Sequence, residues 1–533
     1  MQSFLLYKIS HISIYTVEFL SYLPKKLTMQ SIKAYLSLND FKTIVFGNEK
    51  VTLESEVYSR ITASYEFLKS FSSDKVIYGV NTGFGPMAQY RIQQADQLQL
   101  QYNLIRSHCT GIGDVLKPEM IKAAVLARLN TLSLGKSGVN PTVINLMQEF
   151  INRDIYPVIY AHGSVGASGD LVQLAHVALA LIGEGEVIYK GEIRATKEVF
   201  ELEGLEPMRI EIREGISIMN GTSVMTGIGV VNHYYADKLL QWSVAFSSAI
   251  NELVKAHDDH FSATLNNAKL HEGQQKIAEM MRTHLQDSQL IKKRDSDFYS
   301  GTNQEDIFKD KVQEYYSIRC VPQILGPVLE TIANVGQVLE REINSANDNP
   351  IVSIEDQNVF HGGNFHGDYI SLEMDKLKLV ITRLTMLAER QLIYLLNHKI
   401  NELLPPFVNM GKLGFNFGMQ GAQFTATSTT AENQTLSNPM YVHSIPNNND
   451  NQDIVSMGTN AAVITNKVIT NAFEVLAIQA ITIMQAIDIL EQKDQVSATT
   501  RKIYDDIRQI LPAFSEDSVL YPSIKKVKDY LMQ

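Results

Sequence analysis

Five long segments of this chain carry apolar residues at the spacing of an α-helix. Apolar side chains that recur every three or four residues form one continuous stripe on a helix, and that stripe must be buried against another element. Several segments are longer than about 25 residues, so we expect them to pack lengthwise in a central bundle, within one subunit or across several. The segments are 117–134, 230–257, 322–343, 371–396 and 461–492.

Strand-like segments are short and few. Examples are KVIYGV at 75–80 and EVIYKGEIR at 186–194. The predicted fold class is therefore mainly α. A chain of 533 residues, 45% of them apolar, can bury a large core and is expected to divide into about two to four domains.

Charge and cysteine content narrow the function. The chain has 47 Lys and Arg against 58 Asp and Glu, a net charge of -11, which repels phosphates over most of the surface. We expect no nucleic-acid partner and no membrane partner, and we look for small-molecule chemistry. The two cysteines, Cys109 and Cys320, are too few for a disulfide scaffold and indicate a cytoplasmic protein.

The first 28 residues resemble a signal peptide only superficially. Lys8, His11 and Glu18 interrupt every apolar run, and no basic segment precedes them. We expect residues 1–28 to be a disordered or mis-annotated leader, with no export, and the better-patterned sequence to begin at Met29.

Three common catalytic motifs fit the chain poorly. The segment 83–88 (GFGPMA) matches a dinucleotide-binding pattern, but Pro86 interrupts it and no repeating β-α units follow. The segments 256–260 (AHDDH) and 361–368 (HGGNFHGD) lack the His-Glu-x-x-His spacing or a cysteine pair, so no metal site is expected. Ser168 does not lie in a G-x-S-x-G motif, which leaves a serine hydrolase a weak alternative.

The segment 163–171, GSVGASGDL, is unusual because three small residues stand between glycines just before a helical run. Its purely structural interpretation is a turn in which Asp170 caps the helix that follows. Several other loops between the long helices are rich in Asn, Gly and Ser, which indicates a site built from loops gathered at helix ends.

Seven blocks, in this order along the chain, resemble the aromatic amino acid ammonia-lyases, the family of histidine, phenylalanine and tyrosine ammonia-lyases. The resemblance covers nearly everything after Met29. It implies the mainly α ammonia-lyase fold, similar to fumarase and aspartase, with a long central helix bundle. The blocks are YGVNTGFG at 78–85, GSVGASGDL at 163–171, NGTSVMTG at 220–227, QEYYSIRCVPQ at 313–323, SANDNP at 345–350, GGNFHGD at 362–368 and AENQTLSNP at 431–439.

The resemblance implies that Ala167, Ser168 and Gly169 cyclise to 4-methylideneimidazol-5-one, with no metal or nucleotide cofactor. This would explain the small residues. The Gly169 nitrogen must attack the Ala167 carbonyl at close range, and Ser168 must lose water to become the methylidene carbon.

The same resemblance assigns roles to further residues. Tyr78 matches the base that removes the β-proton and should need a hydrogen-bond donor or a helix N-terminus near its hydroxyl. Tyr316 matches a second catalytic tyrosine, and Arg319 matches the group that pairs with the substrate carboxylate. The remaining positions match substrate-binding residues of the family: Ser107, His108, Asn220, Gln313, Asn349, Phe365, Gln420, Glu432 and Gln452.

Two arguments about the substrate point in different directions. Ser107-His108 matches the histidine ammonia-lyase pattern, and Glu432 could accept a hydrogen bond from an imidazole. The chain as a whole most resembles the flavobacterial tyrosine ammonia-lyases, through SIPNNNDNQD and FNFGMQG among others, and His108 and Gln420 could both bind a phenol. We predict elimination of ammonia from L-tyrosine to give p-coumarate, with histidine to urocanate as the alternative.

Two other classes stay open, a related 2,3-aminomutase and a non-enzymatic helical scaffold. The resemblance further implies a homotetramer whose active sites mix loops from several subunits. It also implies a first domain, residues 29–225, that carries the cyclised triad, and a second, residues 226–533, that contains the long-helix bundle and the C-terminal helices.

Overall fold

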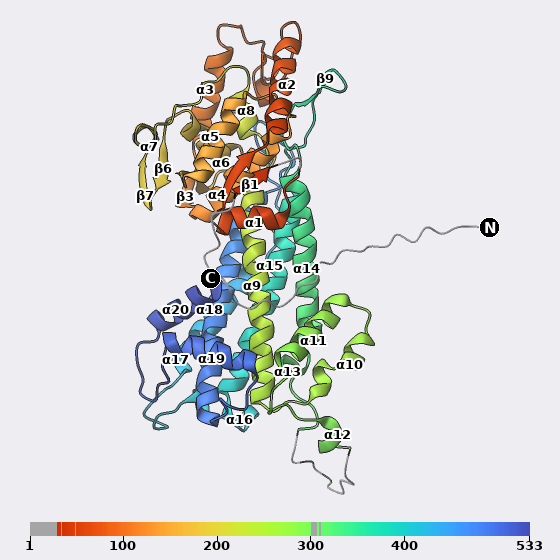
Figure 1. Ribbon diagram of the computed structural model, residues 1–533, viewed down its shortest axis with the longest axis vertical. Coiled ribbons are helices and arrows are strands. Elements are labelled where there is room, and N and C mark those ends of the chain that lie inside the picture. The colour runs from red at the N-terminus through yellow and green to blue at the C-terminus, as the bar shows by residue number, and fades with distance from the viewer. Residues whose placement is uncertain (1–28, 33–34, 48, 300–305, 307, 309–310) are drawn as a thin grey trace, which may run out of the picture.

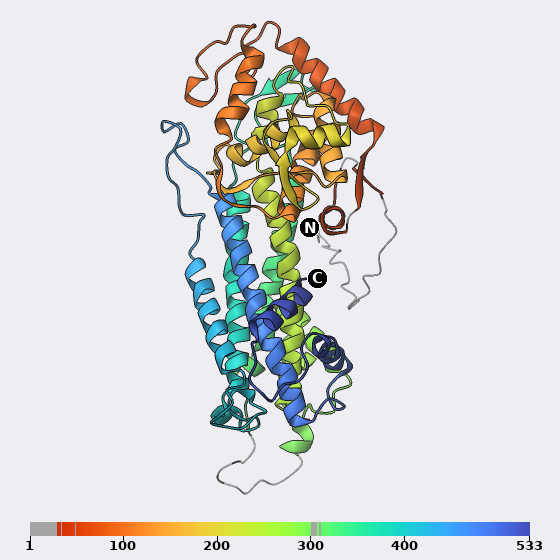
Figure 2. The same ribbon diagram turned by 90° about the vertical axis from the view of Figure 1, so that its left-hand side faces the viewer.

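The computed structural model describes residues 29–32, 35–47, 49–299, 306, 308 and 311–533. Long helices run down the length of an elongated molecule, and shorter elements cover one end of them (Figures 1 and 2). The expected leader, residues 1–28, lies outside the described residues.

Four helices form the centre: α9 (Ser223–Leu253), α14 (Val321–Ile343), α15 (Asp368–Leu396) and α18 (Gly458–Leu490). They lie side by side along their lengths (Figure 2), and α4 (Pro118–Ser133) packs against α9 near the capped end. The apolar residues of α9 and α18 point in nearly all directions and are buried, because neighbouring helices surround both.

The elements that cover the upper end in Figure 1 come mainly from the first half of the chain. Their strands form four small sheets: β1 parallel to β2, and β3–β5, β4–β6–β7 and β8–β9 antiparallel. These strands are β1 (Met29–Ile32), β2 (Lys50–Leu53), β3 (Ile112–Val115), β4 (Tyr156–Pro157), β5 (Tyr160–His162), β6 (Glu186–Tyr189), β7 (Glu192–Ala195), β8 (Ile351–Ser353) and β9 (Asn358–Phe360). The helices are α1 (Leu38–Phe46), α2 (Ser55–Phe71), η1 (Gly85–Met87), α3 (Gln97–His108), α5 (Pro141–Asn152), α6 (Leu171–Leu181), α7 (Thr196–Glu203) and α8 (Glu214–Met219).

Shorter helices also surround the lower end of the bundle (Figure 1). They bring the segments before α14 and after α15 close to the ends of α9 and α18. They are η2 (Asp258–Phe261), α10 (Ala263–Asn267), α11 (Glu272–His284), α12 (Arg294–Asp297), α13 (Tyr316–Arg319), α16 (His398–Asn401), η3 (Pro406–Val408), α17 (Gln420–Leu436), α19 (Ala498–Ile510) and α20 (Tyr521–Met532).

The mainly helical fold and all five long helices are confirmed; 59% of the described residues are helical. The hairpin β6–β7 confirms the strand prediction at 186–194. The prediction at 75–80 is wrong, because these residues form a turn: the backbone N–H of Val80 donates to Ile77 O, and the Asn81 side chain accepts from Ile77 N at 2.8 Å. Ile77 and Val80 are buried in a small apolar cluster rather than pairing as a strand, whereas Val76 is exposed.

Helix α18 is long and apolar enough, by length and composition, to cross a membrane, and 78% of its most apolar window is buried inside the protein. The central helix of a bundle has the same properties. The predicted domain division after residue 225 falls in the first turn of α9, and it stays a prediction.

Candidate active site

The segment Ala167–Ser168–Gly169 lies in the loop between β5 and α6, at the upper end of the bundle. Ala167 and Gly169 are buried and Ser168 is half-buried. Two amide side chains hold the serine: Gln452 Nε2 donates to Ser168 Oγ at 2.7 Å, and Asn220 Nδ2 donates to Ser168 O at 3.0 Å. The structure therefore brings three separate blocks of the sequence together at this triad.

Backbone packs against the triad too closely for a larger residue. Gly169 has φ +70°, and a Cβ there would lie 2.1 Å from Gly221 O. Gly166 has φ +74°, and a Cβ there would lie 2.1 Å from Ser456 Oγ, which donates to Gly166 O. These glycines are required by both backbone conformation and space.

Three helices of the bundle begin at this loop. Gly367, directly before α15, donates its backbone N–H to Gly166 O at 3.1 Å, and Met457, directly before α18, donates to Val165 O at 3.0 Å. Gly221 lies two residues before α9 and accepts from Asp170 N at 2.7 Å. Helix N-termini carry partial positive charge, so they stabilise negative charge that develops on the loop.

The structural interpretation of the loop predicted that Asp170 caps α6. In the structure, the Asp170 side chain makes no capping hydrogen bond to that helix. Its carboxylate accepts from the backbone N–H groups of Val224 and Met225, both at 2.9 Å, and thus caps α9. Ser164 and Thr459 donate their hydroxyls to the same carboxylate. Burial raises the pKa of Asp170, whereas these hydrogen bonds oppose the rise.

Tyr78 lies in the turn that replaces the predicted strand. Its hydroxyl oxygen accepts the backbone N–H of Gly85, the first residue of η1, at 3.2 Å. Its ring meets that of Phe84 edge to face at 6.0 Å. A Cβ on Gly85 would lie 2.7 Å from Asn448 Nδ2, in the loop that also carries Gln452. The expected hydrogen-bond donor for Tyr78 is therefore present.

Ser107 and His108 end α3, which packs against α6 and α8, the helices next to the triad and to Asn220. Nδ1 of His108 lies 2.9 Å from Leu104 O. A carbonyl oxygen can only accept, so Nδ1 carries the proton and Nε2 of the neutral ring is the acceptor.

Asn349 and Phe365 belong to loops at the same end. Asn349 Oδ1 accepts from Gly362 N at 2.8 Å, and Arg213 donates to the Asn349 backbone oxygen at 2.8 Å. Phe365 is half-buried and lies two residues before Gly367, which binds the triad loop.

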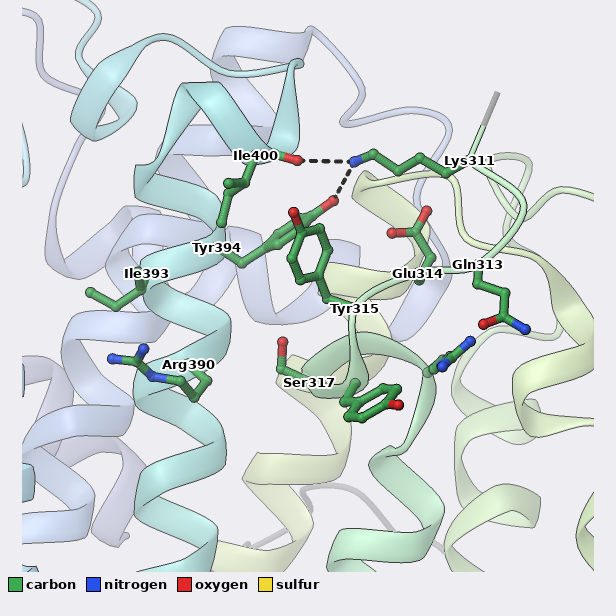
Figure 3. A pocket seen from close by; sticks show the side chains of 11 residues that line it. Lys311, Gln313, Glu314, Tyr315, Ser317, Arg390, Ile393, Tyr394 and Ile400 are labelled. Carbon is green, nitrogen blue, oxygen red and sulfur yellow. Dashed lines mark hydrogen bonds between the residues drawn. The ribbon is translucent and has the colours of Figure 1, made fainter. Parts of the chain in front are cut away.

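The other predicted residues lie at the opposite end of the bundle. Gln313, Tyr316 and Arg319 line a cavity of about 840 Å³ beside α13 and α15 (Figure 3). Tyr316 is 69% exposed, and the guanidinium of Arg319 lies 4.8 Å from the centre of its ring. Both groups are available to a molecule that enters the cavity.

Lys311 fixes the segment before these residues. It donates to Tyr394 Oη at 2.9 Å and to Ile400 O at 3.1 Å, as the dashed lines in Figure 3 show. Glu314 also lines the cavity and is buried; burial raises its pKa, and the charge of Lys311 opposes this. Lys311, Glu314 and Tyr394 were not among the predicted site residues, although Glu314 lies within the block 313–323 and Lys311 two residues before it.

Gln420 and Glu432 lie on α17, also at the lower end in Figure 1. Glu432 Oε2 accepts from Asn471 Nδ2 at 2.6 Å and lies 3.6 Å from Lys467 Nζ. The carboxylate therefore already has an amide and a cation beside it.

The two groups of residues are far apart within one chain. Helix α14 spans 23 residues, about 35 Å, between Arg319 at its start and the 344–350 loop at its end. That loop reaches the triad end, because Asn347 shares a hydrogen-bond network with Asn220 there. One chain thus carries two partial sites at opposite ends of its bundle.

Among the described residues, no group of three or more His, Cys, Asp or Glu is arranged to hold a metal ion. The two histidine-containing segments considered above do not form such a group.

A family model for aromatic amino acid lyases matches residues 36–509. The chain belongs to the aromatic amino acid lyase family. It is 38% identical over 501 residues to a tyrosine 2,3-aminomutase of Myxococcus fulvus, which covers 93% of this chain and 95% of the relative. It is 36% identical over 497 residues to a histidine ammonia-lyase of Bacillus subtilis strain 168, with 93% and 95% covered. The solved structure of a tyrosine aminomutase from Streptomyces globisporus superposes with a TM-score of 0.90 at 34% identity, over 95% of this chain and 97% of that one.

These similarities confirm the family resemblance and the family's mainly α fold. Aromatic amino acid lyases carry out ammonia-lyase or aminomutase chemistry with a 4-methylideneimidazol-5-one group. The residues around the triad fit this group. The glycine positions leave room only for backbone, Asn220 Nδ2 already binds the carbonyl oxygen that the ring would keep, and Asn220 Oδ1 is buried without a partner among the described residues.

Proposed function

We propose that this chain eliminates ammonia from L-tyrosine to give p-coumarate, and that Ala167, Ser168 and Gly169 cyclise to the group that makes this possible. The β C–H bond of an amino acid is only weakly acidic, and ammonia is a poor leaving group; the ring supplies an electrophile that ordinary side chains lack. The triad carries the proposal: its serine is held by two amides and its glycine has no room for a Cβ, in a chain of this family.

The side chains near the triad divide the remaining work. Tyr78 removes the β-proton, and the backbone N–H of Gly85, 3.2 Å from its hydroxyl oxygen, holds that oxygen in place. Asn220 and Gln452 hold the backbone and the side chain of Ser168 in place. Arg319 binds the substrate carboxylate with its planar fork, and the exposed Tyr316 beside it takes part in proton transfer.

Arg319 and Tyr316 can act on the same substrate as Tyr78 only if another subunit supplies them. The two partial sites lie about 35 Å apart along α14. We therefore infer a homotetramer in which the Arg319 end of one subunit meets the triad end of another. The exposed apolar side chains at both ends, such as Met87 and Phe417, support an interface there.

Two side chains favour tyrosine over phenylalanine and histidine as the substrate. Nε2 of His108 is a hydrogen-bond acceptor, which suits the phenol O–H of tyrosine and leaves phenylalanine without a partner for it. Glu432, the candidate partner for an imidazole, is already bound to Asn471 and lies near Lys467. Its remaining capacity to select histidine is reduced.

Two alternative activities have specific support. The 38% identity to a tyrosine 2,3-aminomutase favours an enzyme that returns ammonia to the β-carbon. The Ser107-His108 pair and the 36% identity to a histidine ammonia-lyase favour urocanate as product.

The test combines intact mass and product analysis. The purified chain should have lost two waters, whereas a Ser168→Ala chain should keep them. L-Tyrosine, L-histidine and L-phenylalanine are then supplied separately at mildly alkaline pH, and p-coumarate, urocanate and cinnamate are followed by absorbance. Chromatography of the tyrosine reaction for β-tyrosine detects the aminomutase. Urocanate or β-tyrosine as the main product would show that the activity differs from the proposed one. A mass that keeps both waters, with no product from any substrate, would refute the proposal.

A further inference from the structure

Arg128 is a buried cation near the triad that the proposed function does not use. It lies on α4 among apolar neighbours, and none of its surface is exposed. Burial lowers the pKa of its guanidinium to about 10, so the group stays charged at neutral pH. A charge in such a place is costly unless its hydrogen bonds are satisfied, so its partners indicate what it does.

Arg128 donates to oxygens of the segment 217–222 and of the 344–350 loop. Nη2 donates to the backbone oxygens of Ser217 and Asn220, the latter at 2.8 Å, and Nη1 donates to Asn347 Oδ1 at 3.0 Å. A planar guanidinium can bind these three oxygens at once, whereas a lysine ammonium on a flexible stem is less well shaped for it.

The segment that Arg128 holds is the one pressed against the triad. Asn220 donates its side-chain amide to Ser168 O at 3.0 Å. Gly221 forms an isolated β-bridge with Gly169 and accepts the backbone N–H of Asp170 at 2.7 Å. The Ser168–Gly169 half of the triad thus has Asn220 and Gly221 along one side.

Contact between Arg128 and this segment is close. A Cβ on Gly221 would lie 2.2 Å from Arg128 Nη1 and 2.7 Å from Asn347 Oδ1. Asn347 Nδ2 also donates to Thr222 Oγ1 at 2.8 Å, and Thr222 donates to the half-buried carboxylate of Glu342. Arg128 and this chain of hydrogen bonds fix the 217–222 segment from behind.

We propose that Arg128 is a positioning residue for cyclisation of the triad: it holds Asn220 and Gly221 against Ser168 and Gly169 so that the Gly169 nitrogen stays close to the Ala167 carbonyl carbon. In this reaction the Gly169 nitrogen forms a bond to that carbon. The Ala167 oxygen leaves as water with the amide protons of Ser168 and Gly169. Ser168 then loses its Oγ, with one proton, and its Cα proton as a second water, and no oxidant or reductant is required.

This inference rests on the proposed function, because it requires that the triad cyclises. Arg213 provides a matched control. It is equally buried, and it donates to three backbone oxygens of other residues, those of Ser137, Asn349 and Pro350. Replacing either arginine removes a buried cation, but only the Arg128 side chain donates to residues 217–222, whereas the Arg213 side chain lies 3.8 Å from Asp348.

The experiment measures the fraction of chains that have lost two waters, by intact mass, at matched times after expression and purification. Wild type, Arg128→Met, Arg128→Lys, Arg213→Met and Arg213→Lys are compared, and circular dichroism and gel filtration show which of them fold and assemble as wild type does. In Arg128→Met the cyclised fraction at early times should fall about tenfold or more, since hydrogen bonds to a charged group are lost. Arg128→Lys should recover part of it, and the Arg213 variants should lose both waters as fast as wild type.

The outcomes separate the two proposals. A wild-type chain that keeps both waters refutes the proposed function itself. If wild type cyclises, a folded Arg128→Met chain that loses both waters at the wild-type rate refutes the role of Arg128. Equal slowing in the Arg128 and Arg213 variants also refutes it, because the effect would then follow from any buried cation. Where Arg128→Met does not fold, the comparison of Arg128→Lys with Arg213→Lys decides.

Discussion

His108 offers the sharpest test of the substrate assignment. The bond from Nδ1 to Leu104 O, at 2.9 Å, leaves Nε2 as the only acceptor on the neutral ring. Replacing His108 by Leu would leave the phenol O–H of tyrosine unpaired in the site, at a cost of about 1–3 kcal/mol. Since about 1.4 kcal/mol corresponds to a factor of ten, kcat/KM for tyrosine should fall about 5- to 150-fold.

The kcat/KM for phenylalanine should rise in His108→Leu, because the substitution removes a polar group to which phenylalanine cannot hydrogen-bond. Steady-state kinetics with both substrates give the ratio of their kcat/KM values, which cancels any loss of active enzyme. Ser107→Ala is the matched control: Ser107 Oγ lies 3.1 Å from the same Nδ1, and its removal leaves the bond to Leu104 in place. A tyrosine-to-phenylalanine ratio that stays within twofold of wild type in His108→Leu would refute the reasoning.

Three further predictions follow from the geometry. Ser168→Ala and Arg319→Met chains should each be inactive alone. Coexpressed, they should form mixed oligomers with about a quarter of wild-type activity, because about a quarter of the sites then combine an intact triad from one chain with an intact Arg319 from another. Activity that stays absent would argue against shared sites. Gly166→Ala puts a Cβ 2.1 Å from a serine hydroxyl at φ +74°, and should lower thermal stability by about 1–3 kcal/mol and leave part of the chain uncyclised by mass. Burial lowers the pKa of His284 to about 4, whereas the unfolded chain takes up the proton near pH 6.5. Stability should therefore fall as pH drops through this window, by up to about 3 kcal/mol for this group, and the slope of Tm against pH should be smaller in His284→Gln than in a variant of the exposed His271.

The long helices could be predicted from the sequence because their signal is local. Apolar residues at helical spacing over 20 or more positions, as in α18, leave few other structures open. The error at 75–80 has the opposite cause. A short apolar run fits a strand or a turn equally well, and there a side chain outside the run, Asn81, decides by accepting a backbone N–H.

The composition of the triad loop could be interpreted from the sequence, but its surroundings could not. Asp170 matched the pattern of a cap for the helix next to it, yet its carboxylate caps α9, more than 50 residues away. Gln452 binds Ser168 across 284 residues of sequence. No local pattern encodes such pairs. The one available signal for Arg128 is that it stands inside an apolar helical segment, where a cation requires partners.

The position of the triad explains why a mainly helical bundle suits this chemistry. Cyclisation needs backbone atoms held closer than a free loop allows, and helices that start at the loop provide rigid backbone on several sides. The same helix starts direct partial positive charge at the triad, which favours an electrophile there. Substrate-binding side chains have to approach the triad from the side that the helices leave open. Arg319 of the same chain cannot do so, because the length of α14, about 35 Å, separates it from the triad end. In the proposed shared site, a second copy supplies the carboxylate-binding end and leaves the triad loop rigid, so the mixed-oligomer experiment tests the architecture as well as the assembly.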